Sequence, residues 1–186
     1  LNGQSNNGLD DAFVSKFNND GEIQWTRLLG TSESDEGKSI AIGSDGSIYV
    51  AVANDDVFIS KFNSDGDKQW TKFVGVYGSY GIYRGSTTDG VGIDVADDDS
   101  IYITGNTLRD LDGQTNNGVH ADAFISKYNP DGTREWTRLL DTSDDDIGYA
   151  LTTGSDGSIY IAGNTLGDLD DQTNSGQDDV FISKYS

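Results

Sequence analysis

Short runs in which apolar and polar residues alternate recur along the whole chain, and polar turns separate them. In residues 11–17 (DAFVSKF) the side chains alternate between two faces, which is the two-residue period of a β-strand. Asp20-Gly21 follows, and such a pair favours a hairpin turn because it tolerates positive φ angles. Residues 23–29 (IQWTRLL) are therefore predicted as the return strand. Residues 38–43 and 47–52 predict a second hairpin in the same way.

This pattern is repeated. The motif D-[AV]-F-[VI]-S-K-[FY] begins near Asp11, Asp56, Asp122 and Asp179, and the first three copies are followed by N-x-D-G-x-x-x-W-T. A repeat of roughly 40–50 residues with four strands per unit predicts the blades of a β-propeller. No segment has the 3.6-residue apolar period of a helix. We therefore expect an all-β fold built from four-stranded antiparallel blades.

The order of the strands follows from side-chain size. The inner strand of a blade is crowded, and the small residues of KSIAI (38–42) suit it, so we assign this run as strand A. SIYVAV is then strand B, VFISKF strand C and KQWTKFV the outer strand D. In this phasing the chain contains thirteen strands, in the order C-D, A-B-C-D twice and A-B-C. We expect residues 1–186 to form one propeller domain or propeller segment, with incomplete blades at both ends.

The strongest compositional signal is negative charge. The 186 residues include 12 Lys and Arg against 32 Asp and Glu, a formal net charge of -20. Four of the 32 are Glu and the other 28 are Asp, the carboxylate that caps turns and reaches cations at short range. Such a charge disfavours nucleic acid and anionic membranes as partners.

Cysteine is absent, which excludes disulfides and thiolate chemistry, and no apolar run approaches the ~20 residues of a membrane helix. The chain opens inside a repeat without Met or a visible signal peptide, so we expect a processed product or a fragment. An acidic, Cys-free repeat chain of this kind is typical of a secreted or cell-surface protein.

The stretch DAFISKYNPDGTREWTRLL and the following DGSIYIAG together resemble the bacterial, cyanobacterial-type seven-bladed β-propeller repeat of large secreted and cell-surface proteins. The resemblance covers almost the whole chain. It implies propeller blades and no assigned enzyme activity. Three and a fraction repeats do not fill a ring of seven blades. Asp98-Asp99 also stands where the other copies have Asp-Gly, so that turn should change its geometry or hold a strained residue.

Calcium is the sharpest candidate ligand. Asp110, Asp112, Gln114 and Asn116 place oxygen atoms at alternate positions beside a glycine, as in a Ca²⁺-binding loop. The alternative is that these residues cap turns through local hydrogen bonds. Both interpretations are open at this stage.

An equivalent loop follows one repeat later. It offers Asp168, Asp170 and Asn174, and either Asp122 or Asp179, at the start of a strand C, would complete a site. Both loops lack the downstream Glu of an EF-hand, which excludes the helix–loop–helix version of the site.

The insertion at residues 75–90 is the best candidate for binding another ligand. It carries Tyr77, Tyr80, Tyr83 and Arg84 among glycines, a composition typical of recognition loops, and tyrosines stack on carbohydrate rings. A purely structural role, covering the edge of the fold, is the alternative.

Catalysis has little support in the sequence. His120 is the only histidine and is absent from the other copies of its loop. We therefore predict a non-catalytic binding or scaffold module, stabilised by calcium, whose ring is completed by a second copy or by a longer parent chain. One alternative is a polysaccharide hydrolase or lyase that uses Asp residues. Another is a structural subunit of a surface assembly or a glycan-binding lectin.

Overall fold

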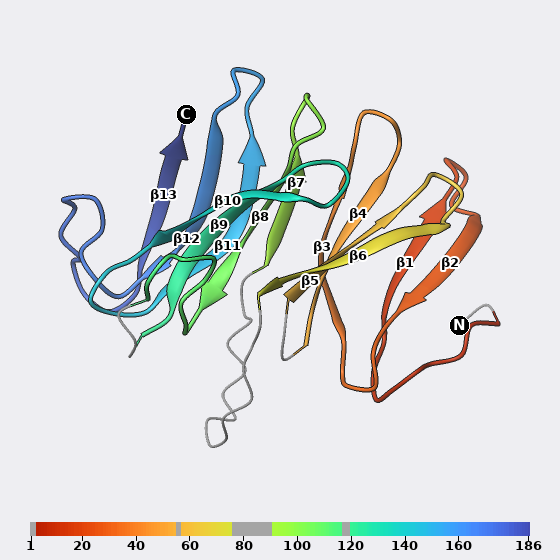
Figure 1. Ribbon diagram of the computed structural model, residues 1–186, viewed down its shortest axis with the longest axis horizontal. Helices are drawn as coiled ribbons and strands as arrows, with labels where there is room; N and C mark the ends of the chain where they lie inside the picture. The colour runs from red at the N-terminus through yellow and green to blue at the C-terminus, as the bar shows by residue number, and fades with distance from the viewer. Residues whose placement is uncertain (1–2, 55–56, 76–90, 117–119) are drawn as a thin grey trace. The chain divides into compact units, whose positions relative to one another are not determined.

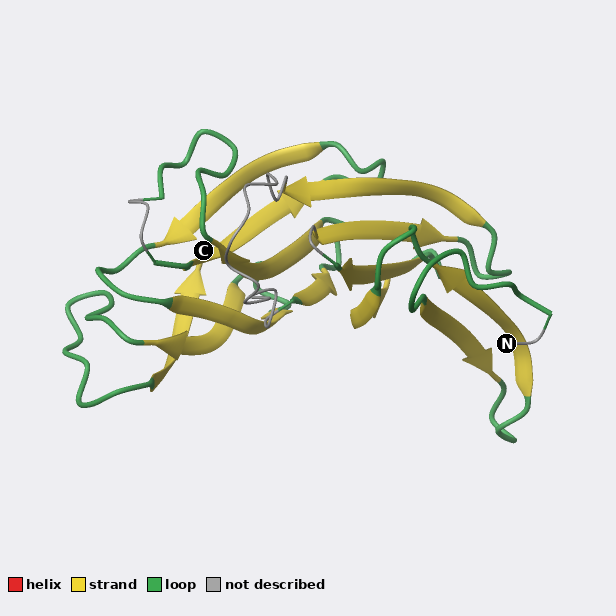
Figure 2. Cartoon of the chain, turned by 90° about the horizontal axis from the view of Figure 1, so that it is seen from below, coloured by secondary structure: helices red, strands yellow, loops and turns green. Residues whose placement is uncertain are grey.

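The computed structural model describes residues 3–54, 57–75, 91–116 and 120–186, and within these ranges it contains strands and turns but no helix (Figure 2). These residues accordingly hold no helix that is long and apolar enough to cross a lipid bilayer. The strands are β1 (Ala12–Phe17), β2 (Ile23–Leu29), β3 (Glu36–Ile42), β4 (Ile48–Ala53), β5 (Val57–Phe62), β6 (Lys68–Gly75), β7 (Gly92–Val95), β8 (Ile101–Thr107), β9 (Asp122–Tyr128), β10 (Arg134–Leu140), β11 (Asp146–Thr153), β12 (Ile159–Thr165) and β13 (Asp179–Tyr185).

The strands form four antiparallel sheets (Figure 1). β1 pairs with β2, β3 to β6 form a four-stranded sheet, β7 to β10 form a second one, and β11 to β13 form a three-stranded sheet. This grouping matches the predicted order C-D, A-B-C-D twice and A-B-C, so the all-β class and the four-stranded antiparallel sheets are confirmed. The number of blades in a closed ring stays a prediction.

The hairpins between strands A and B share one turn geometry, including the turn with the unusual sequence. Gly46 and Gly157 have φ angles of 78° and 80°, and Asp99 has a φ of 62° at the equivalent position. Each donates its N–H to a carbonyl three residues earlier, at 3.0 Å for Gly46 and 2.9 Å for the other two. The turn with Asp99 therefore keeps its geometry and holds a non-glycine residue in the left-handed region, where Asp is among the better tolerated side chains.

The chain forms two compact units, Leu1–Tyr77 and Gly78–Ser186, which are described separately. In the first unit the sheet β1–β2 packs on the sheet β3–β6 through one apolar cluster. Its buried members are Ala12, Val14 and Leu29 from the two-stranded sheet and Ile48, Val50, Val52, Phe58 and Phe62 from the four-stranded one. A single domain spanning residues 1–186 stays a prediction.

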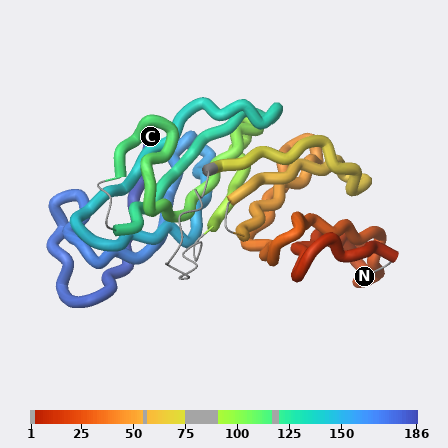
Figure 3. The backbone as a smooth tube through the Cα atoms, turned by 60° about the horizontal axis from the view of Figure 1, so that its bottom comes forward, coloured from red at the N-terminus to blue at the C-terminus, as the bar shows by residue number. Residues whose placement is uncertain are grey.

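The second unit repeats this arrangement. β11 packs against β7, β8 and β9, so two sheets lie side by side (Figure 3). The buried cluster between them contains Tyr102, Ala123, Ile125 and Leu140 from one sheet and Ile159, Ile161 and Phe181 from the next. Because strand C of one sheet faces strands B and C of the following sheet in both units, each sheet needs a neighbour to bury its face.

Candidate functional site

The loop at residues 110–116 is a tight hairpin. Leu111 and Gln114 exchange backbone hydrogen bonds of 3.0 and 2.9 Å. The two residues between them, Asp112 and Gly113, have φ angles of 56° and 78°, so this is a two-residue turn of the kind that requires two positive φ angles. Asp110 Oδ1 accepts the Asn116 N–H at 3.0 Å, which closes the base of the hairpin.

The loop that follows β12 has the same construction. Leu169 and Gln172 exchange the equivalent backbone bonds, and Asp168 Oδ1 accepts the Asn174 N–H at 2.8 Å. The Asn174 side-chain amide donates to the Thr165 and Gln177 carbonyls. The polar residues of both loops thus make the local hydrogen bonds of the turn-capping interpretation.

Among the residues that the structure describes, no group of three or more His, Asp or Glu side chains is arranged to hold a metal ion. Asp179 accepts hydrogen bonds from the Ser175 backbone N–H at 2.7 Å and from the Ser175 hydroxyl. Calcium binding stays a prediction.

Asp112 connects its loop to an outer strand. Asp112 Oδ2 accepts a hydrogen bond of 2.6 Å from the Thr137 hydroxyl of β10, and Asp112 Oδ1 forms an ion pair with the Arg134 guanidinium of the same strand. These two contacts hold strand D (β10) against the loop of its own sheet, and we call them the loop clamp. Asp170 occupies the equivalent loop position, but its sheet contains no described strand D.

Asp122 and Asp146 form a buried acidic pair in the second unit. They are 2% and 0% exposed, and among the described residues Asp122 Oδ2 and Asp146 Oδ1 have no hydrogen-bond partner. Burial, with added repulsion from the Asp141 and Asp146 carboxylates, raises the pKa of Asp122 to about 7. Burial also raises the pKa of Asp146, whose Oδ2 accepts the Thr142 N–H. At neutral pH this pair therefore tends to hold a proton.

Asp122 was predicted as a candidate calcium ligand, whereas the burial of Asp146 was not predicted. A usable signal was present: Thr31 and Asp35 recur as Thr142 and Asp146, and the Thr31 N–H donates to Asp35 Oδ2 at 2.6 Å. The spacing T-x-x-x-D thus marks a loop between strands D and A that is closed by a buried carboxylate.

The repeated tryptophans connect strand D to a tyrosine of strand B or to a turn of the neighbouring sheet. Trp70 and Trp136 pack on Tyr49 and Tyr102 of their own sheets, with ring centroids 6.0 and 6.1 Å apart. Trp25 donates its indole N–H to the Ser64 carbonyl in the C–D turn of the neighbouring sheet, at 3.3 Å. Trp70 and Trp136 thus pack strand D within its own sheet, and Trp25 packs it against the next sheet.

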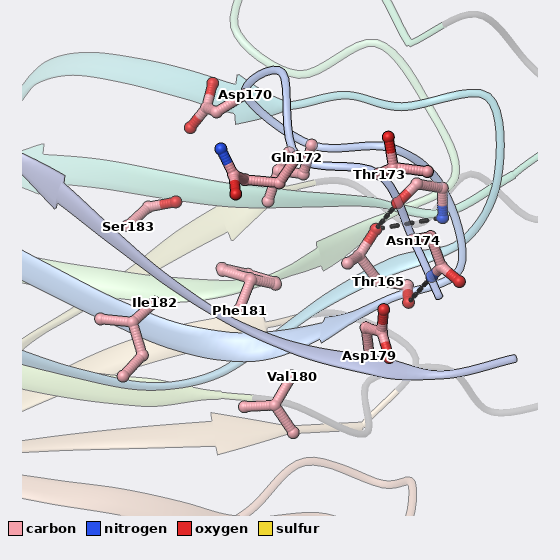
Figure 4. Close-up of a pocket in the computed structure, with 12 residues that line it drawn as sticks. Thr165, Asp170, Gln172, Thr173, Asn174, Asp179, Val180, Phe181, Ile182 and Ser183 are labelled. Atoms are coloured by element: carbon pink, nitrogen blue, oxygen red, sulfur yellow. Dashed lines mark hydrogen bonds between the residues drawn. The ribbon is translucent and has the colours of Figure 1, made fainter. Parts of the chain in front are cut away.

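A groove of about 290 Å³ runs along β13, the last strand of its sheet. Asp170, Gln172 and Ser183 gather at one end of it, and Thr165, Asn174 and Asp179 at the other (Figure 4). Val180 and Ile182 of the same strand are 79% and 75% exposed. This groove, at an unpaired sheet edge, is the candidate binding site.

The remaining candidate residues are those of the insertion at residues 75–90 and His120. Tyr77, Tyr80, Tyr83 and Arg84 lie outside the described residues, so their role as a ligand-binding group stays a prediction. His120 Nδ1 lies 3.6 Å from Asp145 Oδ1 on the surface.

Comparisons with known proteins support the architecture. A family model described as a beta-propeller repeat matches residues 24–51. This stretch begins in β2 and ends in β4, so the matched repeat continues from one sheet into the next. The match supports a β-propeller repeat in this part of the chain; a cyanobacterial type and a ring of seven blades stay predictions.

Two other proteins are similar, and the chain spans only part of the length of each. The chain is 24% identical over 189 residues to the "Regulatory protein FlaEY" of Caulobacter vibrioides, a match that covers 100% of this chain and 15% of that protein. A solved structure of a protein of unknown function from Bacteroides caccae covers 89% of this chain and 51% of its own, with 11% identity and a TM-score of 0.52. At this identity the structural likeness concerns the fold alone.

Proposed function

We propose that this chain is a non-catalytic binding or scaffold module built from β-propeller blades, in which a second copy or a longer parent chain completes the ring. The observation that carries the proposal is the open edge of β13. Within the described residues β13 is paired with β12 alone, and the groove along it is lined by polar groups and exposed apolar side chains. An unpaired edge of this kind is a template for strand addition.

A secreted or cell-surface location and stabilisation by calcium belong to the same proposal. The net charge of -20 favours both, because outside the cell millimolar divalent cations would relieve the repulsion. The unpartnered oxygens of Asp122 and Asp146 make that pair a better place for a cation than the loop carboxylates that already accept N–H groups.

The buried pair Asp122 and Asp146 does not support the alternative function as a hydrolase or lyase. A raised carboxyl pKa beside a second carboxylate is what glycoside hydrolysis needs. However, these two side chains are 2% and 0% exposed, and a polysaccharide would not reach them.

Native mass spectrometry in calcium-containing buffer and after chelation tests the proposal. We expect a defined oligomer with a whole number of Ca²⁺ ions per chain that dissociates on chelation. A calcium-free monomer in both buffers would exclude calcium and completion by a second copy together, and would leave only the longer parent chain.

A further inference from the structure

Three of the described C strands are paired on their outer side, and in each case the partner is a D strand with the same sequence pattern. β1, β5 and β9 pair with β2, β6 and β10, whose sequences are IQWTRLL, KQWTKFVG and REWTRLL. β13 has the sequence DVFISKY of a C strand and, within the described residues, no outer neighbour. The chain therefore contains three internal examples of what covers such an edge.

The first recurring contact joins two hydroxyl groups. Ser15 Oγ lies 2.8 Å from Thr26 Oγ1, and the pairs Ser60–Thr71 and Ser126–Thr137 are both 2.7 Å apart. In each pair the threonine follows the tryptophan of strand D. Ser183 is the equivalent serine of β13 and lines the groove, without a threonine beside it among the described residues.

The second contact is aromatic. Tyr49 and Tyr102 each pack against the strand-D tryptophan and are 1% and 7% exposed. A lysine of strand C lies over each tyrosine ring. Tyr160 has the same lysine, with Lys184 Nζ 5.5 Å from the ring centroid. The tryptophan is the missing third member, and Tyr160 is only half-buried.

The third contact is the loop clamp. Asp112 accepts the Thr137 hydroxyl and pairs with Arg134. Asp170 has the same turn conformation, with a φ of 47° against 56° for Asp112, and lines the groove. The residue equivalent to Arg134 is Lys68 in β6 and Ile23 in β2. The groove thus presents a carboxylate to a strand that carries a basic residue at this position in two of its three internal forms.

We propose that the β13 groove recognises one further strand of the type x-[QE]-W-T-[KR]-[LF]-[LV], supplied by another β-propeller repeat. By the register of β9–β10 and β5–β6, its threonine lies opposite Ser183 and its tryptophan opposite Lys184. The inference rests on the proposed function and names the partner of its open edge.

The strand β2 of a second copy fits the groove less well, because its side chains are already engaged. Thr26 is bonded to Ser15, the Trp25 indole donates to Ser64, and Arg27 donates to the carbonyls of Gly66 and Asp65. A strand with these groups free is the better occupant.

A synthetic peptide of residues 133–141 (TREWTRLLD), labelled with a fluorophore at its N-terminus, tests the proposal by anisotropy titration against the full chain. We expect saturable binding. Replacing Trp136 by Ala in the peptide should weaken binding about tenfold or more, and Thr137→Val about 2- to 10-fold.

A double-mutant cycle locates the contact. In the chain, Ser183→Ala should weaken binding of the unmodified peptide by a similar factor. In this variant the further change Thr137→Val in the peptide should have no effect on affinity, because both substitutions remove the same hydrogen bond. The exposed Ser155→Ala is the matched control and should leave affinity unchanged.

Three outcomes would overturn the proposal: no saturable binding up to about 1 mM peptide with the chain folded, equal affinity for the Trp136→Ala peptide, or additive effects in the cycle. A peptide-free dimer that the peptide dissociates would make β2 of a second copy the occupant instead of a further repeat. A monomer that still binds the peptide would retain the inference while excluding completion by a second copy.

Discussion

At the scale of the residue, the abundant aspartates act mainly through turn chemistry. Asp45 and Asp156 accept the N–H of the serine two residues later, at 2.7 and 3.0 Å, as Asp98 does in the turn with Asp99. These hydrogen bonds lower the pKa of each of the three carboxyls. A sequence so rich in Asp is therefore explained in large part by its hairpins.

Gly21 and Gly66 occupy equivalent turns, so substituting each by Ala distinguishes the cost of backbone strain from the cost of a steric clash. Gly21 and Gly66 have φ angles of 81° and 79°. A Cβ at Gly21 would meet nothing within 4 Å, whereas at Gly66 it would lie 2.8 Å from the Trp25 ring. We expect Gly21→Ala to cost about 1 kcal/mol of unfolding free energy, and Gly66→Ala about 1–3 kcal/mol more. Urea denaturation of both variants checks this, and equal losses would contradict the packing of Trp25 at this turn.

Asp122 predicts an unusual pH dependence. Its pKa in the folded chain is about 7, above the ordinary value of 3.8, so its contribution to stability is complete below pH 3.8 and is lost as the pH rises through 7. Asp146, whose pKa is also raised, acts in the same direction. We expect the unfolding free energy to fall by roughly 2 kcal/mol between pH 5 and pH 8.

The variant Asp122→Asn should flatten this dependence and be more stable than the unchanged chain at pH 8 in calcium-free buffer. The exposed Asp178→Asn is the control. If Asp122→Asn lowers stability equally at pH 5 and pH 8, the carboxyl is not the titrating group.

At the scale of the element, the loop that clamps strand D offers a matched comparison. Asp112 and Asp170 share a turn and a positive φ, but only Asp112 has Thr137 and Arg134 as partners. We expect Asp112→Asn to cost about 1.5–3 kcal/mol, the range for hydrogen bonds to charged groups. Asp170→Asn should cost less than about 0.5 kcal/mol in the chain alone. Similar losses in chemical denaturation would show that the clamp adds nothing.

The sequence predicted the strands well because every strand is set by local signals. The two-residue period of β9 and the Asp-Gly turns lie within a few positions of one another. The strand at which each sheet begins followed from the small residues of strand A. The candidate site was predicted less well. Alternating oxygens at residues 110–116 fit a cation or a two-residue turn equally, and the partner of Asp112 comes from a strand 25 positions later. The sequence offers no local signal for such a contact.

At the scale of the whole molecule, the net charge of -20 opposes folding through self-repulsion. We expect the melting temperature to rise with NaCl and to level off near 0.5 M, about where screening is complete over a few ångströms. A specific calcium site predicts a larger rise with CaCl₂ than with MgCl₂ at equal ionic strength. Equal effects of the two salts would attribute the stabilisation to screening alone.

β13 is an edge strand, and we infer that a strand of the β10 type covers it. Hydrogen exchange of the β13 amides that point away from β12, measured by NMR with and without the peptide of residues 133–141, shows whether this edge is open and whether the peptide pairs with it. We expect fast exchange of these amides in the chain alone and protection when the peptide is bound, with the Trp136→Ala peptide giving little protection. Protection without peptide in a monomer, or unchanged exchange at saturating peptide, would contradict this inference.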